Sequence, residues 1–342
     1  MAITNDLLSS TLYSIRESFV DELYKKVPFL DHARTMGGIE MEDGGIKIQR
    51  PLALAEHSSI TQLPTGYEPV NIAVSDPLRP AVYDWCDYVA PVVITQKEEL
   101  ENRGAKAIIK ILEARTKSVF GLLKRECNKQ ILGNASLILT DLNTLNGNTG
   151  GSGSATGFLE ENAVGAQTNV IGGISKATYA ATRGWQNQVG NAAGAFSTNG
   201  LAAMNQIYLN ANAVAPMGDI GLIIASIDAM ANYKRVLQAQ ERYIDPKVLD
   251  GGRMALAFAG ALVEQDADMP ANAGGAANDE YSMYFINFDA LKLVIMEDAD
   301  YAISDFVHDI SSTARVAKVY HKEQLIADHL GSLGVLYGGN TY

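Results

Sequence analysis

The chain has 342 residues, of which 47% are hydrophobic and 19% are charged, so it can bury a sizeable core and is long for one compact domain. Its net charge is −12 and no basic block is longer than Lys124-Arg125, which argues against tight direct binding to nucleic acid. The two cysteines, Cys86 and Cys127, form no CxxC motif, so neither a disulfide framework nor a zinc site is indicated. No signal peptide or membrane span is recognisable, which predicts a soluble protein made in a reducing cytosol.

An amphipathic helix is predicted near the start of the chain, between possible cap residues at 4–6 and Pro28. Apolar side chains recur on one face at spacings of three and four: Leu8, Leu12, Ile15, Phe19 and Leu23. Such a stripe packs either on the chain's own core or on the surface of another molecule, and the sequence leaves both readings open.

Residues 45–94 are the most informative segment, because apolar side chains alternate over 46–54 and again over 70–74, as in strands. Six of the ten prolines fall here, and proline removes backbone donors that a wide sheet needs. We therefore expect a long two-stranded ribbon that needs cover from outside the local fold. Its apolar side chains are Leu52, Leu54, Ile60, Leu63, Tyr83 and Trp85. An active-site lid is the alternative.

A long helix is predicted over 95–132. Thr95 and Glu98 form a capping box at its start, and Gly133 follows its end. At 1.5 Å per residue such a helix is about 55 Å long. Gly104 and Gly121 lie in its interior, where glycine lowers helix stability and allows a bend.

The rest of the chain alternates between strand and helix patterns. A helix is expected over 199–212, and 214–298 has the pattern of a compact α/β unit. The elements predicted in that unit are a strand at 220–225, a helix at 226–238 and strands at about 254–264, 282–288 and 291–297. Two strand-like runs, at about 314–326 and 332–337, are expected to return beside the long helix, which would make that domain discontinuous.

No catalytic constellation is recognisable. The glycine-rich loop 147–154 lacks the GK[ST] ending of a phosphate-binding loop, and 173–177 misses the GxSxG motif at its last position. The five histidines show no metal-ligand spacing, and the acidic run 297–300 is more typical of a solvated strand end than of a cation site. We therefore expect no catalytic, cofactor-binding or metal-binding residues, no cofactor and no enzymatic activity.

The order of these elements resembles the major capsid proteins of tailed bacteriophages, which share the Hong Kong 97-type (Johnson) fold. Four short sequence motifs also resemble this family. They are Tyr83-Asp84-Trp85 with Ile94-Thr95, Gly172 to Tyr179 followed by Trp185-Gln186-Asn187, Gln238 to Tyr243, and Tyr284 to Leu293. The resemblance implies an α+β fold with an N-arm at 1–36 and an extended two-stranded E-loop at 45–94. The P domain would comprise 37–44, 95–213 and 299–342, with its spine helix at 95–132. A compact A domain would comprise 214–298.

The resemblance also implies a structural subunit of an icosahedral phage head, which assembles with copies of itself into pentamers and hexamers that enclose double-stranded DNA. The E-loop side chains and the arm residues Leu8, Leu12, Ile15 and Phe19 would contact neighbouring subunits. Gly104 and Gly121 would let the spine helix bend as the shell expands. Because the only ribbon lysine, Lys47, lies at the ribbon's base, covalent cross-linking is not expected.

The expected partners follow from the same resemblance. Since Met1 directly precedes the arm, a separate scaffolding protein is implied, together with a portal and room for a decoration protein. The expected location is the virion, after assembly in the bacterial cytoplasm and without a membrane. Two alternatives stay open: an encapsulin-like compartment, which shares the fold but encloses protein cargo, and an enzyme whose lid is 45–94.

Overall fold

A computed structural model of the chain describes residues 27–54, 62–67, 69, 78–101, 105–133, 142, 157–179, 184–192, 195–216, 218–239, 247–248, 254–269, 281–308 and 314–339. The predicted N-terminal helix, with Leu8, Leu12, Ile15 and Phe19, lies outside these residues, as do Ile60 and Gly104. Among the helices that are described, none is long and apolar enough to cross a bilayer.

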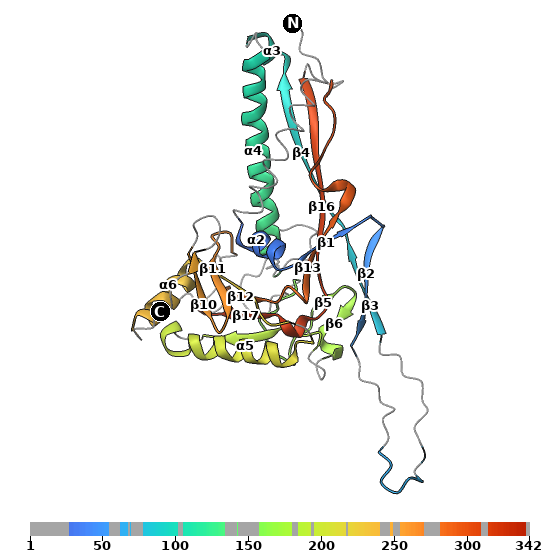
Figure 1. Ribbon diagram of the computed structural model, residues 1–342, viewed down its shortest axis with the longest axis vertical. Coiled ribbons are helices and arrows are strands. Elements are labelled where there is room, and N and C mark those ends of the chain that lie inside the picture. The colour runs from blue at the N-terminus through green and yellow to red at the C-terminus, as the bar shows by residue number, and fades with distance from the viewer. Residues whose placement is uncertain are drawn as a thin grey trace.

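The elongated upper part of the molecule in Figure 1 is a long helix beside a pair of long antiparallel strands. These elements are α3 (Gln96–Glu101), α4 (Ala105–Ile131), β4 (Cys86–Thr95) and β16 (Ala314–Ala327). β4 pairs with β16 along its whole length, from Cys86 opposite Glu323 to Thr95 opposite Ala314. Buried side chains recur along α4 at spacings of three and four, which gives the helix one inward face: Leu112, Thr116, Phe120, Leu123, Cys127 and Ile131. Near the end of the helix Asn128 and Gln130 are buried as well.

β16 is the central strand of a six-stranded sheet. Its further partners are β13 (Leu291–Met296), β14 (Ala302–Ile303) and β15 (Val307–His308), all antiparallel to it, and β1 (Ile39–Glu42) pairs in parallel with β13. The short helix α2 (Pro28–Thr35) packs nearby, with the Phe29 and Phe288 ring centroids 5.6 Å apart. The 3₁₀ turn η3 (Glu297–Ala299) joins β13 to β14.

A seven-stranded mixed sheet forms the lower body. Its strands, in spatial order, are β7 (Gln188–Asn191), β17 (Gly334–Tyr337), β12 (Tyr281–Ile286), β8 (Leu222–Ala225), β11 (Ala261–Gln265), β10 (Met254–Phe258) and β9 (Lys247–Val248). The helical elements of this part are α5 (Leu201–Val214), α6 (Ile227–Ala239), the π-helical turn η2 (Phe196–Gly200) and the 3₁₀ turn η4 (Leu330–Ser332). β17, the last described strand, lies between β7 and β12 in the sheet.

A two-stranded ribbon projects from the junction of these two parts (Figure 1). It is formed by β2 (Lys47–Ala53) and β3 (Leu78–Asp84), which pair from Lys47 opposite Asp84 to Ala53 opposite Leu78. A short hairpin, β5 (Val170–Ile171) and β6 (Ile174–Ser175), lies beside its base and leads into the 3₁₀ turn η1 (Lys176–Tyr179).

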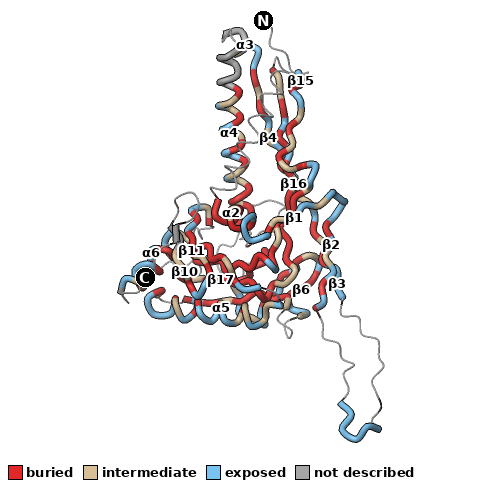
Figure 2. The backbone as a smooth tube through the Cα atoms, in the orientation of Figure 1, coloured by how far each residue is buried: buried red, intermediate tan, exposed pale blue. Residues whose placement is uncertain are grey.

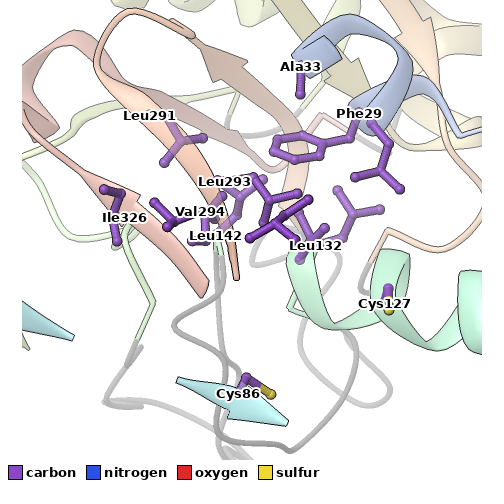
Figure 3. Close-up of a cluster of buried hydrophobic side chains, with 14 of the residues drawn as sticks. Phe29, Ala33, Cys86, Cys127, Leu132, Leu142, Leu291, Leu293, Val294 and Ile326 are labelled. Atoms are coloured by element: carbon purple, nitrogen blue, oxygen red, sulfur yellow. The ribbon is translucent and has the colours of Figure 1, made fainter. Parts of the chain in front are cut away.

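Burial divides between two hydrophobic clusters. The larger one joins the inner face of α4 to β13 and β16, and Figure 3 shows Phe29, Leu132, Leu293 and Val294 converging there. The second lies between the seven-stranded sheet and the helices α5 and α6. Figure 2 shows that buried backbone is concentrated in the lower body and along the inner side of the upper part.

Most local predictions are confirmed. The helices expected over 199–212 and 226–238 are α5 and α6, and the strand expected at 314–326 is β16. At the predicted capping box, the Thr95 backbone N–H donates to the Glu98 carboxylate over 3.1 Å. The Thr95 hydroxyl donates to the same carboxylate over 2.7 Å rather than accepting from the helix, and these bonds lower the pKa of Glu98.

Strand pairing differs from expectation in four places. Residues 86–94 belong to β4 in the six-stranded sheet and not to the ribbon. β13 pairs with β16, outside the compact unit expected at 214–298, whereas β7 and β17 join that unit's sheet. The strand expected at 254–264 is a hairpin, because Ala259 and Gly260 have positive φ angles of 49° and 100° and reverse the chain. Each difference concerns a partner or a turn, which periodicity alone does not specify.

Gly121→Ala is expected to stabilise the folded chain by about 0.5–1 kcal/mol, because alanine favours a helix interior over glycine. Gly121 is exposed on α4, and an added Cβ would meet no atom within 4 Å. Gly334→Ala is the matched contrast: its Cβ would lie 2.3 Å from Cγ2 of the buried Ile207, so we expect a loss of about 1–3 kcal/mol. Urea denaturation of both variants checks the pair, and equal effects would contradict this account.

Candidate assembly site at the base of the ribbon

The predicted contact residues divide into two groups. Leu52, Leu54 and Tyr83 are 6%, 6% and 2% exposed, so the chain's own body already covers them. Burial of these three side chains does not require a neighbouring subunit, and their predicted contact with one stays a prediction. Trp85 is partly buried against the main core, and its indole N–H donates to the Gly45 carbonyl over 3.0 Å. Leu63, 47% exposed, is the described member of the set that still presents apolar surface.

A backbone contact between β3 and the β5–β6 hairpin anchors the ribbon's base. The Val82 N–H donates to the Gly172 carbonyl over 3.0 Å. Gly172 has a φ of +57°, and a Cβ there would lie 2.9 Å from that of Ala81, so both conformation and space require glycine. On the other side, the Tyr83 hydroxyl donates to the Ala327 carbonyl at the end of β16 over 3.2 Å. Burial raises the pKa of Tyr83, so this donor stays protonated.

Ion pairs connect the ribbon to β1. Arg50 on β2 bonds to Glu40 and lies 3.6 Å from Glu42, both on β1. Across the ribbon, Lys47 and Asp84 form a 2.9 Å ion pair between directly opposite residues. These groups are partly exposed, so each pair contributes little to stability alone. Together they connect β2 to β1 on one side and to β3 on the other.

A buried lysine organises the segment that supports the hairpin. Lys176 is fully buried, and its ammonium group donates to the Phe158 carbonyl and to Asn187 Oδ1, each over 2.8 Å. The Glu160 carboxylate lies 3.9 Å away. Burial lowers the pKa of Lys176 to about 7, and the neighbouring Glu160 charge partly opposes that shift.

Amide side chains complete this network. Asn187 donates to the Glu160 carbonyl over 3.0 Å, and Gln167 donates to the Asn187 carbonyl over 2.8 Å. The Trp185 indole N–H donates to the Ile174 carbonyl over 3.2 Å. The sequence pattern 172–179 followed by 185–187 is thus one polar cluster that fixes the hairpin against the ribbon.

The exposed apolar side chains mark where another molecule can contact the chain. On and beside the ribbon they are Ile46, Leu63, Tyr67 and Leu78, which are 92%, 47%, 94% and 55% exposed. On the upper sheet, Val89 and Tyr320 are 55% and 37% exposed and lie directly opposite each other on β4 and β16. Sequence reasoning missed this second pair, because Tyr88, Val89 and Ala90 are all apolar and alternation does not show which faces outward.

No protein-family model and no curated protein matches the chain. Solved structures do match. The cyanophage A-1(L) capsid asymmetric unit aligns with a TM-score of 0.58 at 14% identity, covering 89% of this chain and 92% of that chain. The capsid of an empty GTA particle aligns with a TM-score of 0.53 at 12% identity, covering 89% and 88%.

The chain has the Hong Kong 97-type capsid fold. A third match, the holo-SrpI encapsulin complex from Synechococcus elongatus, has a TM-score of 0.51 at 9% identity and covers 89% of this chain and 86% of that chain. α4 and the β2–β3 ribbon lie within the residue ranges predicted for the spine helix and the E-loop.

Lys176→Met is expected to destabilise the protein by about 3 kcal/mol, because it removes the ammonium donor from the buried Phe158 carbonyl and leaves Asn187 Oδ1 with the Glu160 backbone N–H as its donor. Lys318→Met, at an exposed lysine on β16, is the control and should stay within about 0.5 kcal/mol of wild type. Urea denaturation measures both, and similar values for the two variants would exclude the anchoring role of Lys176.

The effect of Lys176 should also depend on pH. Between about pH 7 and the ordinary lysine pKa of 10.5, the unfolded chain holds more of this proton than the folded chain. Wild type should therefore gain about 1 kcal/mol of unfolding free energy per pH unit relative to Lys176→Met as pH rises from about 7.5 to about 9. Below pH 7 both states carry the proton and the difference is constant. A gap that narrows with rising pH would contradict the burial of this charge.

Proposed function

We propose that the chain is the major capsid protein of a tailed bacteriophage, a structural subunit that assembles with copies of itself. The observation that carries this proposal is the likeness to the cyanophage A-1(L) capsid, at a TM-score of 0.58 over 89% of the chain. Pentamers and hexamers tiling an icosahedral shell around double-stranded DNA are the expected assembly. No catalytic step is part of the proposal.

The proposed domains follow strand pairing where it departs from the sequence pattern. We assign the N-arm to 1–36 and the E-loop to the ribbon 47–84, and we place β4 in the P domain because it pairs with β16. The A domain is the seven-stranded sheet with α5 and α6, so it takes in β7 and β17.

The exposed part of the E-loop is the proposed contact with a neighbouring subunit. Leu63 and Tyr67 offer apolar surface that the chain's own body does not cover. Repetition of one such contact over many copies is what stabilises a closed assembly. The arm residues Leu8, Leu12, Ile15 and Phe19 are proposed to add to it. A net charge of −12 suits an inner wall that repels packed DNA instead of binding it.

Other components of the proposal rest on the resemblance alone. They are a separate scaffolding protein, a portal, a decoration protein, assembly in the bacterial cytoplasm and a final location in the virion. Gly121 is proposed to let the spine helix bend during expansion, and Gly104 is proposed to do the same. Gly121→Ala particles that expand normally would remove Gly121 from this proposal.

An encapsulin-like compartment is the second candidate, favoured by the alignment with the holo-SrpI encapsulin complex. The two functions differ in what the shell encloses. Particles made in the presence of the chain's neighbouring genes would contain nuclease-protected DNA in the first case. In the second they would contain a protein cargo and no protected DNA.

Deletion of residues 55–68, rejoined through a short Gly-Ser linker, is expected to leave a folded subunit that fails to close shells. The β2–β3 pairing lies outside the deletion, so the ribbon's base and its contacts with Gly172 and Ala327 are preserved. Sedimentation and negative-stain electron microscopy measure assembly, and circular dichroism verifies folding. The double substitution Leu63→Ser with Tyr67→Ser is the milder variant and should reduce particle yield.

The control substitution is Ile227→Ser, at an exposed apolar residue on α6 that is 55% exposed and lies far from the ribbon along the chain. It should leave particle yield unchanged. Uniform shells from the deletion variant would refute the proposed E-loop contact. A wild-type chain that stays monomeric alone and with its neighbouring genes would refute the capsid function itself.

A further inference from the structure

A cluster of potential metal ligands lies between the spine helix and the central strand. Cys127 comes from α4, and His321 and Glu323 come from β16. His321 and Glu323 are two residues apart on a strand, so both side chains point to the same face, toward the helix. The three possible ligand atoms lie within 4.8 Å of one another, and all three residues are 1% exposed.

The imidazole of His321 is held in a defined orientation. Its Nε2 lies 3.2 Å from the Glu323 carboxylate, and its Nδ1 faces Asp300 Oδ1 at 3.7 Å. The Tyr301 ring stacks on it, with centroids 4.1 Å apart and planes 16° apart. A metal-bound histidine commonly directs its second ring nitrogen at a carboxylate in this way. Two ligands on a tetrahedral zinc lie about 3.4 Å apart, close to the His321–Glu323 separation.

Two buried polar atoms of the cluster make no hydrogen bond within the part of the chain that the structure describes. Among the described residues, Glu323 Oε1 and His321 Nδ1 have no hydrogen-bond partner, although both residues are 1% exposed. A buried carboxylate without full compensation is costly. The nearest basic side chain in the sequence, Lys322, points the other way and pairs with Asp87 at 3.0 Å. A cation between Glu323, His321 and Cys127 would supply the missing compensation.

We propose that Cys127, His321 and Glu323 bind one Zn²⁺ ion per subunit, with Asp300 positioning His321. Sulfur, imidazole nitrogen and carboxylate oxygen together form a ligand set typical of zinc, whereas magnesium and calcium prefer oxygen ligands alone. Binding replaces the thiol S–H of Cys127 by a zinc–sulfur bond and releases that proton to solvent.

The ion would fasten α4 to β16 at a point where no covalent link joins them. Cys127 lies on the inner face of the helix, one turn before its end at Ile131, and is 1% exposed. His321 pairs in register with Tyr88 on β4, so the same point also ties in the neighbouring strand. The zinc would thus stabilise the P domain without taking part in catalysis.

The test uses the full chain, stripped with EDTA and titrated with Co²⁺ and then Zn²⁺. Cobalt should bind at one ion per chain with a thiolate-to-metal charge-transfer absorption, and zinc should displace it. Cys127→Ser should abolish that absorption, and Asp300→Asn should weaken zinc affinity about 10–100-fold. Cys86→Ser is the matched control: Cys86 is also buried and in no disulfide, lies opposite Glu323 on β4 without belonging to the ligand group, has its thiol 3.9 Å from the Gln130 side-chain oxygen, and should leave the absorption intact.

A second measurement on the wild-type chain does not depend on any variant folding. The thermal midpoint should rise when zinc is added to the stripped protein and fall again with EDTA, since zinc binds the folded state preferentially. The proposal is overturned if the stripped wild type binds neither ion above a non-specific background. It is equally overturned if Cys127→Ser, verified as folded, keeps the cobalt absorption.

Discussion

The pairing of β4 with β16 is the interaction on which the rest of the structure depends. It joins two segments from opposite ends of the described chain along the full length of β4, and α4 packs against the resulting surface. Backbone hydrogen bonds in such a ladder satisfy polar groups that burial would otherwise leave unpaired. The Phe120 and Tyr301 rings, 6.0 Å apart, link the helix to the chain between β13 and β14. Without β16, α4 would lose part of the sheet that covers its apolar face.

The ribbon's direction depends on a second, smaller set of contacts. Gly172 approaches β3 so closely that no side chain fits, and the Lys176 network holds the hairpin carrying Gly172 in place. Arg50 and Lys47, both on β2, add ion pairs to Glu40 on β1 and to Asp84 on β3. The projecting ribbon needs such a fixed base, because a long two-stranded element has little stability alone in water. The polar cluster around Lys176 therefore supports the projecting element from a distance.

The sequence predicted individual elements better than their partners. The Thr95–Glu98 cap, the faces of α5 and α6 and the length of β16 all follow from local patterns. Which strands pair does not, since β13 and β12 have similar apolar sequences yet lie in different sheets. Leu52 and Tyr83 were expected at a subunit contact because a two-stranded ribbon is marginal alone. In the structure both are buried within the chain, and the Tyr83 hydroxyl donates to the Ala327 carbonyl, a partner too distant in sequence for a local pattern to show. The His-x-Glu spacing at 321–323 predicts that both side chains lie on the same face of a strand. The proximity of Cys127 to them depends on the fold and could not be predicted from the sequence.

The place of β17 constrains how the chain can fold. Residues 334–337 lie between β12 and β7, so the seven-stranded sheet remains split into two pieces until those residues have been synthesised. β16, which precedes β17 directly, must likewise wait for its partner β4, made long before. Both sheets depend on pairings between distant segments, which form slowly. A nascent chain therefore carries incomplete sheet edges throughout translation and becomes competent to meet other copies only once both sheets have closed.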